Sequence, residues 1–306
     1  MFSDIADTVQ VIGAEAASSP AEGADGIPDS ARDPFLTRLT GTPVERIHGL
    51  ATLQPYPNEG QWVHGAAMSL LSEIADGLKI GRLNALGYRD QLAELERHGL
   101  AEGRRLTEDG DTLAEFLRDP AASIRITASY GEHEPSFQAW VAGDKVLVAA
   151  STGYVAATEG KDGGQPTPDH FNVQISRLTD LSTLMAQWVG LQPAWNLPVF
   201  PMIVPDDVLT RRWQGDGTYP EGASETLQEM WHENWFVWNL VAVGPESEAG
   251  PVSYVNAGRM GHYRLGAEEG ENGEGTAFVP TPSAAVYDQF EDAIQACLYG
   301  RQPRHP

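Results

Sequence analysis

Residues 124–151 read IRITASYGEHEPSFQAWVAGDKVLVAAS. Apolar side chains occupy alternate positions over 124–130, and two further apolar runs follow at 136–141 and 145–151. Gly131 and a Gly-Asp pair lie in the turns between the runs. A period of two places every second side chain on the same face of a strand, and short turns join antiparallel neighbours. The stretch therefore predicts a meander of antiparallel strands.

The region before the meander has the spacing of helices. Apolar residues recur there at intervals of three and four, which predicts amphipathic helices. Thr107 is an N-cap candidate for the last helix, and Pro120 ends it. The expected elements are helices near 66–78 and 84–97, a short hairpin over 100–106, and a helix from 108.

The order of elements recurs after the meander. An alternating strand at 171–175 leads into a helix over 181–189, and residues 206–231 again read as helical or mixed. A second set of strands and a final helix from Pro282 follow, with the strands at 235–243, 251–257, 262–265 and 276–279. Helices, a meander and a helix, repeated twice, predict a pseudo-symmetric α+β fold.

Composition divides the chain into three parts. Residues 1–33 are rich in Ala, Ser, Gly, Asp and Glu, and are expected to form a disordered acidic arm. Residues 34–298 are expected to form one α+β domain, with one half at about 44–190 and the other at about 200–298. Residues 299–306 form a short tail.

The charge of the chain excludes some classes of partner. Its 43 acids and 20 bases give a net charge of −23, whereas nucleic-acid binding depends on neutralising phosphates with Lys and Arg. No apolar run has the length of a membrane span, no secretory signal is visible, and Cys297 is the single cysteine. These features predict a cytoplasmic protein that is a monomer or weak dimer, binds no nucleic acid and does not insert into membranes.

Motifs for catalysis or for metal binding are incomplete in this sequence. There is no Gly-x-Ser-x-Gly elbow, and the segment 153–161 has the wrong spacing for a phosphate loop and reads as a solvated loop. His232-Glu233 begins a zincin motif, but Phe236 stands where the second histidine is needed. Cys297 lies on an apolar helix stripe. We therefore expect no enzymatic activity and no catalytic, cofactor or metal site, although a site assembled from distant residues stays open.

One alternative is a DNA-binding winged helix over 62–118. The second helix of such a unit enters the major groove, and this one and its flank carry Lys79, Arg82 and Arg89. Acids lie among these bases, however, and residues 43–118 contain 12 acids and 8 bases. A structural helical unit is the favoured interpretation, and a transcriptional regulator with an acidic sensing domain is the alternative function.

Aromatic residues gather in the second half of the chain. Four tryptophans lie within residues 213–238, where they either fill a core or anchor a partner. The candidate partner-binding residues, taken from the helices and loop of this half, are Trp213, Tyr219, Leu227, Trp231, Phe290 and Ile294.

The layout and several weak motifs resemble the EspG family of type VII (ESX) secretion chaperones. The resemblance covers about 45–298 and is clearest over 92–190; the Trp-rich segment 213–238 matches no family motif. The motif residues are Leu95, Gly99, Leu100, Gly103, Leu106 and Thr107, followed by Leu117-Arg118-Asp119-Pro120 and Ile124-Arg125-Ile126. The resemblance implies a pseudo-two-fold fold with a central antiparallel sheet flanked by two helical bundles. It also implies a cytosolic, non-enzymatic chaperone that binds the apolar tip of a PE–PPE heterodimer and keeps it soluble for export.

Overall fold

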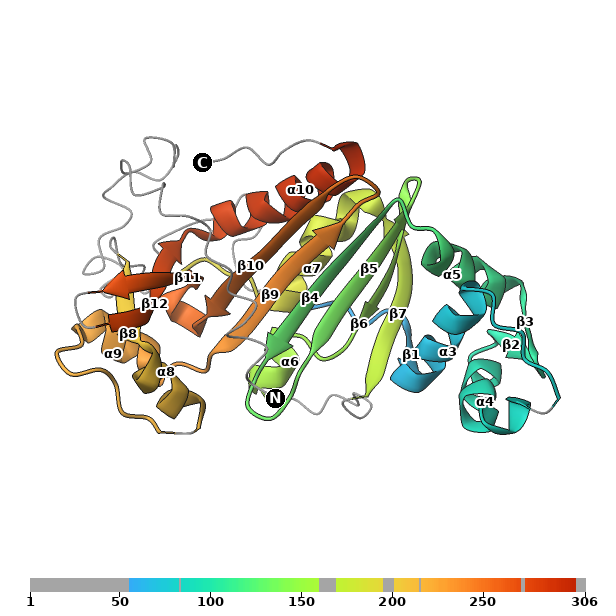
Figure 1. The fold of residues 1–306 in the computed structure, drawn as a ribbon, viewed down its shortest axis with the longest axis horizontal. Helices are drawn as coiled ribbons and strands as arrows, with labels where there is room; N and C mark the ends of the chain where they lie inside the picture. The colour runs from blue at the N-terminus through green and yellow to red at the C-terminus, as the bar shows by residue number, and fades with distance from the viewer. Residues whose placement is uncertain are drawn as a thin grey trace.

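Ten strands form a single antiparallel sheet in the computed structural model, which describes residues 55–82, 84–159, 169–194, 201–214, 216–270 and 273–300. The predicted arm, 1–33, and residues 301–306 of the predicted tail lie outside this part of the chain. The spatial order of the strands is β1-β7-β6-β5-β4-β9-β10-β11-β12-β8 (Figure 1). Their bounds are β1 Gln61–His64, β4 Ala122–Ser129, β5 Ser136–Ala142, β6 Lys145–Ala150, β7 His170–Arg177, β8 Met202–Pro205, β9 Phe236–Val243, β10 Glu248–Asn256, β11 His262–Gly270 and β12 Gly273–Thr281.

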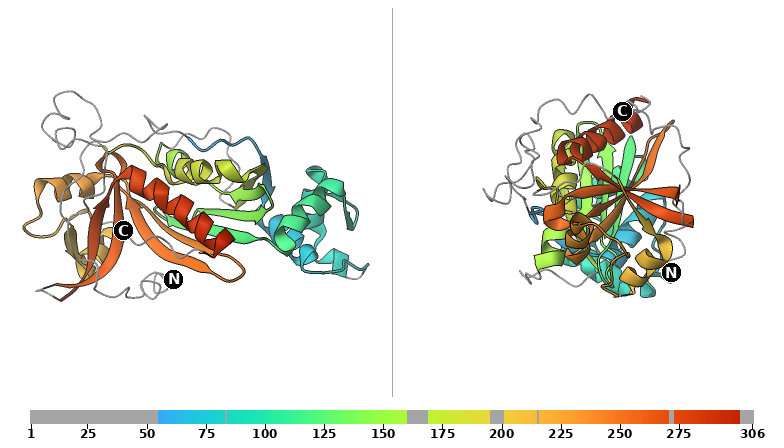
Figure 2. Two further views of the ribbon diagram at one scale, coloured as in Figure 1. Left: turned by 90° about the horizontal axis from the view of Figure 1, so that it is seen from above. Right: turned by 90° about the vertical axis from the view of Figure 1, so that its left-hand side faces the viewer.

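Helices cover the two ends and one face of this sheet (Figure 2). At one end lie α3 (Gly65–Ala75), α4 (Arg89–Arg97) and α5 (Glu108–Arg118), together with the hairpin β2 (Ala101–Glu102) and β3 (Arg105–Leu106). At the other end lie α8 (Asp206–Trp213) and α9 (Glu225–His232), while α6 (Tyr154–Glu159), α7 (Leu181–Val189) and α10 (Ser283–Tyr299) cover one face. The predicted α+β class with an antiparallel sheet is confirmed.

Three hydrophobic cores correspond to these three groups of helices. The largest lies between the sheet and the layer of α6, α7 and α10, and contains the fully buried Trp188, Trp238 and Phe290. A second core joins α3, α4 and α5 to β6, and a third joins α8 and α9 to β9–β12. Each group of helices therefore buries its own apolar stripe against a different part of the sheet.

The chemistry of the caps explains several helix ends. The Thr107 side chain accepts a hydrogen bond from the backbone N–H of Gly110 at 3.2 Å, which confirms the predicted N-cap of α5. Gly190 ends α7 in the left-handed conformation, with φ of +71°, which other residues adopt only with strain.

Two predicted elements near α3 and α4 need correction. The helix expected over 66–78 ends at Ala75, because the chain turns at Gly77, where φ is +101°. The helix expected over 84–97 is a short 3-10 turn, Asn84–Leu86, followed after Gly87 and Tyr88 by α4.

Three further elements differ from the sequence predictions. The solvated loop expected at 153–161 contains the short helix α6. The strands β1 and β8 were not predicted; each has four residues and lies at one edge of the sheet. Edge strands of this length give too few positions for an alternating pattern to be visible.

Strands β4 and β9 join the parts of the sheet that come before and after residue 200. Their antiparallel register pairs Ser123 with Val243 and Ser129 with Val237. Because paired residues face the same side, Ile124 and Ile126 lie beside Ala242 and Leu240 in the largest core. The alternate residues of both strands face the opposite side of the sheet.

Candidate partner-binding surface

The middle of the sheet has one face that no described helix covers, and we call it the open sheet face. In Figure 1, β9, β4 and β5 pass in front of α7, with α3–α5 at one end and α8–α9 at the other. Arg125 and Thr127 of β4 are exposed on this face. Its remaining residues, partly or fully exposed, are Ser123, Ser129, Gln138, Asn239, Val241, Val243 and Ser253.

The open sheet face lacks the negative charge that dominates the rest of the chain. None of the residues of β4, β5, β6, β7 or β9 is an Asp or Glu, although the chain contains 43 acids and has a net charge of −23. The charged side chains that these strands expose on this side are the bases Arg125, Lys145 and Arg177. Over these five strands the face is therefore neutral to positive, and Glu248 of β10, which pairs with Val243, adds an exposed acid at its margin.

Apolar side chains are also exposed on this side of the sheet. Ile175 of β7 and Val243 of β9 are both more than two-fifths exposed, whereas Trp140 of β5 is half-buried against the core of α3, α4 and α5. Ser253 of β10 donates a side-chain hydrogen bond to Asn239 of β9, which fixes a polar pair on the same side of the sheet. A mixed apolar and cationic surface of this kind is suited to binding another protein.

The six residues proposed from the sequence as partner contacts do not lie together on the surface. Trp213, at the end of α8, is 44% exposed, and Tyr219, in the loop after it, is 40% exposed. Leu227, Trp231, Phe290 and Ile294 are buried: the first two belong to the core beneath α8 and α9, and the last two belong to the core beneath α10. We retain Trp213 and Tyr219 as candidate contacts and assign core packing to the other four.

Arg212 lies beside Trp213 and is held by two indole rings. Its guanidinium carbon is 3.9 Å from the centre of the Trp235 ring and 4.8 Å from that of Trp231, both within cation–π range. Its Nη2 donates a 2.9 Å hydrogen bond to the backbone carbonyl of Glu233. Burial lowers the pKa of the Arg212 guanidinium to about 10, so the group stays charged at neutral pH.

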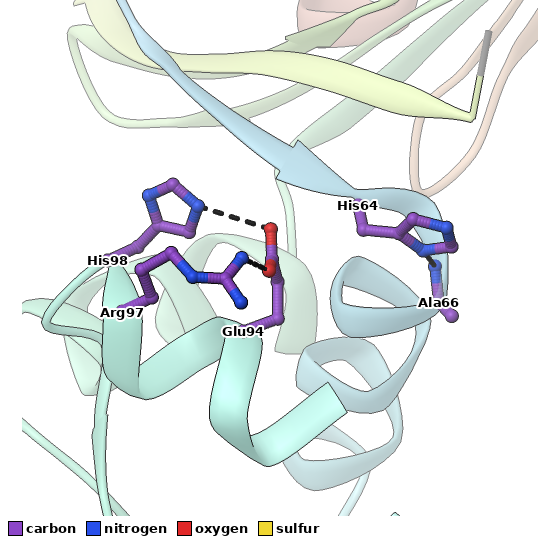
Figure 3. Close-up of polar contacts among 5 residues, drawn as sticks. All are labelled: His64, Ala66, Glu94, Arg97 and His98. Atoms are coloured by element: carbon purple, nitrogen blue, oxygen red, sulfur yellow. Dashed lines mark hydrogen bonds and ion pairs between the residues drawn. The ribbon is translucent and has the colours of Figure 1, made fainter. Parts of the chain in front are cut away.

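A buried carboxylate connects α4 with β1 (Figure 3). Glu94 accepts hydrogen bonds from Arg97 and from Nε2 of His98, the latter at 3.2 Å. Burial raises the pKa of the Glu94 carboxyl, but the His98 hydrogen bond, the Arg97 charge and a hydrogen bond from the His64 backbone outweigh it and lower the pKa. His64 in turn caps α3, because its Nδ1 accepts a 3.1 Å hydrogen bond from the Ala66 N–H.

Two residues considered for chemistry, Cys297 and His232, belong to different helices. Cys297 is buried on α10, and burial raises the pKa of its thiol. His232 ends α9, and its ring packs against Tyr219. Within the described ranges, no group of three or more His, Cys, Asp or Glu residues is arranged to hold a metal ion, and no helix is long and apolar enough to cross a membrane.

Comparisons with known proteins found similarity among solved structures. No family model matches the sequence, and no curated protein matches it. Among solved structures, the chain is similar to the Mycobacterium tuberculosis type VII secretion system chaperone EspG5, in the structure of its complex with the PE25–PPE41 dimer. The sequences are 14% identical, the match covers 80% of this chain and 99% of EspG5, and the TM-score is 0.47.

The match is to a protein of the class that the sequence resembles over 45–298. At this identity the similarity concerns the fold alone.

The open sheet face was not found from the sequence, although a signal for it exists. Alternate residues of 123–129 and 237–243 that face away from the core are uncharged or basic, in a chain rich in acids. These residues form one surface only because β4 pairs with β9. Neither segment has a sequence feature that predicts this pairing.

Proposed function

We propose that the protein is a non-enzymatic chaperone or adaptor that binds a type VII secretion substrate and keeps it soluble for export. The client class, a PE–PPE-like helical heterodimer, follows from the resemblance of the sequence to EspG chaperones. The observation that carries a binding role is the open sheet face, which lies between two groups of helices and whose strands β4, β5, β6, β7 and β9 contain no Asp or Glu.

The physical logic combines shielding with solubility. An apolar tip of a helical client aggregates when it is exposed, and contact with Val243 and Ile175 would cover it. The remaining surface of the carrier, with its net charge of −23, would keep the complex dispersed. Trp213 and Tyr219 would extend the contact beyond the sheet.

We also infer that the chain consists of two related halves. The strand order supports this inference, because from the β4–β9 pair outward each side has the same succession. On one side, β4 is followed outward by β5, β6 and β7, and the earlier strand β1 forms the edge. On the other side, β9 is followed by β10, β11 and β12, and the earlier strand β8 forms the edge. Superposition of the two halves in an experimental structure would test it.

A binding experiment tests the proposed function. The purified chain is mixed with a PE–PPE-like heterodimer and analysed by size-exclusion chromatography with light scattering, where a 1:1:1 complex is expected. Arg125→Glu reverses a charge at the centre of the open sheet face and is expected to weaken the complex at least tenfold. Arg104→Glu makes the same charge change in the β2–β3 turn and is the matched control.

Two results would count against the proposal. If pulldowns from the native cytosol recover no helical substrate, and Arg125→Glu behaves like Arg104→Glu, the binding role at this face is wrong. Salt-dependent binding to duplex DNA would favour the regulator alternative instead.

A further inference from the structure

Arg212 is fixed in one orientation by its surroundings. Trp231 and Trp235 are 1% and 8% exposed and pack edge to face, with ring centres 5.0 Å apart. The guanidinium lies over both rings, and the carbonyl of Glu233 accepts from one of its N–H groups. The side chain therefore loses little further freedom when it binds another group.

Arg212 differs from its neighbour Arg211 in having no carboxylate partner. Nη2 of Arg211 lies 3.3 Å from a carboxylate oxygen of Asp207, one turn earlier in α8. Among the residues that the structure describes, no carboxylate lies within ion-pair distance of Arg212. A cation that is partly withdrawn from water normally has a counter-ion, because desolvation without one is costly.

The free donors of Arg212 define what it can bind. A guanidinium has five N–H donors in a planar fork, and Glu233 uses one of them. Stacking on indole rings covers a face of the guanidinium plane, whereas its edge, where the N–H groups point, is the part that matches the two oxygens of a carboxylate. Phosphate groups are usually bound by clusters of bases, but Arg211 and Arg212 are the only bases between 201 and 233.

The residues that follow Arg212 in the sequence indicate a protein ligand. Trp213 and Tyr219 are exposed beside it in the chain, and the Tyr219 ring is supported by His232 at a centre distance of 6.2 Å. Arg, Trp and Tyr are the residue types most enriched where protein interfaces gain their affinity. Their concentration on one short segment, with one cation that has no counter-ion among the described residues, fits an interface anchor.

We propose that Arg212 is the anchor for an Asp or Glu carboxylate of the bound client. Trp213 and Tyr219 pack against apolar groups beside that carboxylate. This inference rests on the proposed function, since it assigns a specificity contact to the same client. It requires the client to carry an acidic side chain next to its apolar contact surface.

Calorimetric titration of the full chain with a PE–PPE-like heterodimer tests the anchor. Arg212→Gln removes the charge and is expected to weaken binding about 10- to 100-fold. Arg212→Lys keeps the charge but loses the fork, so we expect a loss of about tenfold. Arg211→Gln is the matched control and is expected to stay within about twofold of wild type. Circular dichroism and thermal unfolding of each variant verify that it is folded.

Substitutions in the client identify the partner group. If the proposal is right, one Glu→Gln or Asp→Asn change in the client abolishes the difference between wild type and Arg212→Gln. If the complex forms and Arg212→Gln binds like wild type, the anchor is wrong while the proposed function stands. If Arg212→Gln instead changes the sedimentation coefficient of the free protein, a second copy of the chain occupies the site, and the proposal is also wrong.

A second measurement applies even if no client complex forms, in which case the proposed function fails. The Arg212 Nε–H signal in a nitrogen-15 NMR spectrum is followed while poly-L-glutamate is added. A shift that is absent with inorganic phosphate supports carboxylate recognition at this side chain. No shift, or a shift with phosphate alone, overturns it.

Discussion

The side-chain amide of Asn256 donates a 2.8 Å hydrogen bond to the backbone carbonyl of Val189, which lies 67 residues earlier in the chain. The same amide donates to the carbonyl of Gly190, and its oxygen accepts from the N–H of Gly258. The fully buried Asn256 side chain thus provides hydrogen bonds to two backbone carbonyls at the C-terminal end of α7 and links this helix to β10.

Replacing Asn256 by Ala should therefore destabilise the protein. The change leaves two carbonyls and one N–H without their partner in the interior, and the expected loss is about 2–4 kcal/mol in the free energy of unfolding. Urea unfolding followed by circular dichroism measures it. Asn239 is a half-buried residue of the open sheet face, and Asn239→Ala is the matched control. It should lower the free energy of unfolding by less than about 1 kcal/mol. Equal losses would show that burial of the Asn256 network is not the cause.

Two glycines with nearly the same backbone conformation should respond differently to substitution by Ala. Gly99 and Gly190 have φ of +70° and +71°, but only at Gly190 would a Cβ atom enter the ring of Tyr154. Gly99→Ala should cost about 1–2 kcal/mol from backbone strain alone. Gly190→Ala adds a buried clash and should cost at least about 2 kcal/mol more. Thermal and urea unfolding of the pair measure the difference, and equal costs would contradict the contact with Tyr154.

Glu94 should make the stability of the contact between α4 and β1 depend on pH in the acid range. Its pKa is lowered in the folded protein, so its stabilisation is complete above the unfolded value of about 4.3 and is lost as pH falls through the folded value. Glu94→Gln should cost about 1–3 kcal/mol near neutral pH. We expect the difference in the free energy of unfolding between wild type and Glu94→Gln, measured from pH 7 to pH 3, to shrink below about pH 4.5. A difference that stays constant over this range would contradict the assignment.

His262 should also make the protein sensitive to acid, over a different range. Burial lowers its pKa to about 3, and neither ring nitrogen has a hydrogen-bond partner among the described residues. The unfolded chain takes up a proton below about pH 6.5 while the folded chain does not, so stability falls from that pH downward.

His262→Leu should remove that part of the pH dependence. It also removes two buried polar atoms without partners, so we expect no loss, or a small gain, in stability at pH 7. Unfolding of the variant and wild type between pH 7 and pH 4 measures both effects. A parallel decline of the two proteins would show that another group causes the acid sensitivity.

Local sequence patterns were sufficient to predict most elements of the fold. The alternation over 124–151 predicted the strands of the first meander, and the apolar spacing predicted α7 at its observed bounds. These patterns depend on residues that are near each other in sequence. The pairing of β4 with β9 does not, because many strands of this chain have an apolar face that would fit.

The surface was harder to predict than the fold. Trp213 and Trp231 both lie on short amphipathic helices, yet the first is largely exposed and the second is buried. Helix periodicity shows that one side is apolar, but not how far the covering core extends. The cation–π contacts of Arg212 were also not predictable, since they need α8 to meet Trp231 of α9 and Trp235, which directly precedes β9.

The pairing of β4 with β9 also affects how the chain folds during synthesis. The largest core includes β4, completed early in synthesis, and α10, which ends at Tyr299. While a ribosome is still adding β9 and α10, the apolar face of β4 and the edge beside it stay unpaired, as in other folds dominated by long-range strand contacts. A protein proposed to shield the apolar surfaces of others therefore exposes its own until the last helix emerges.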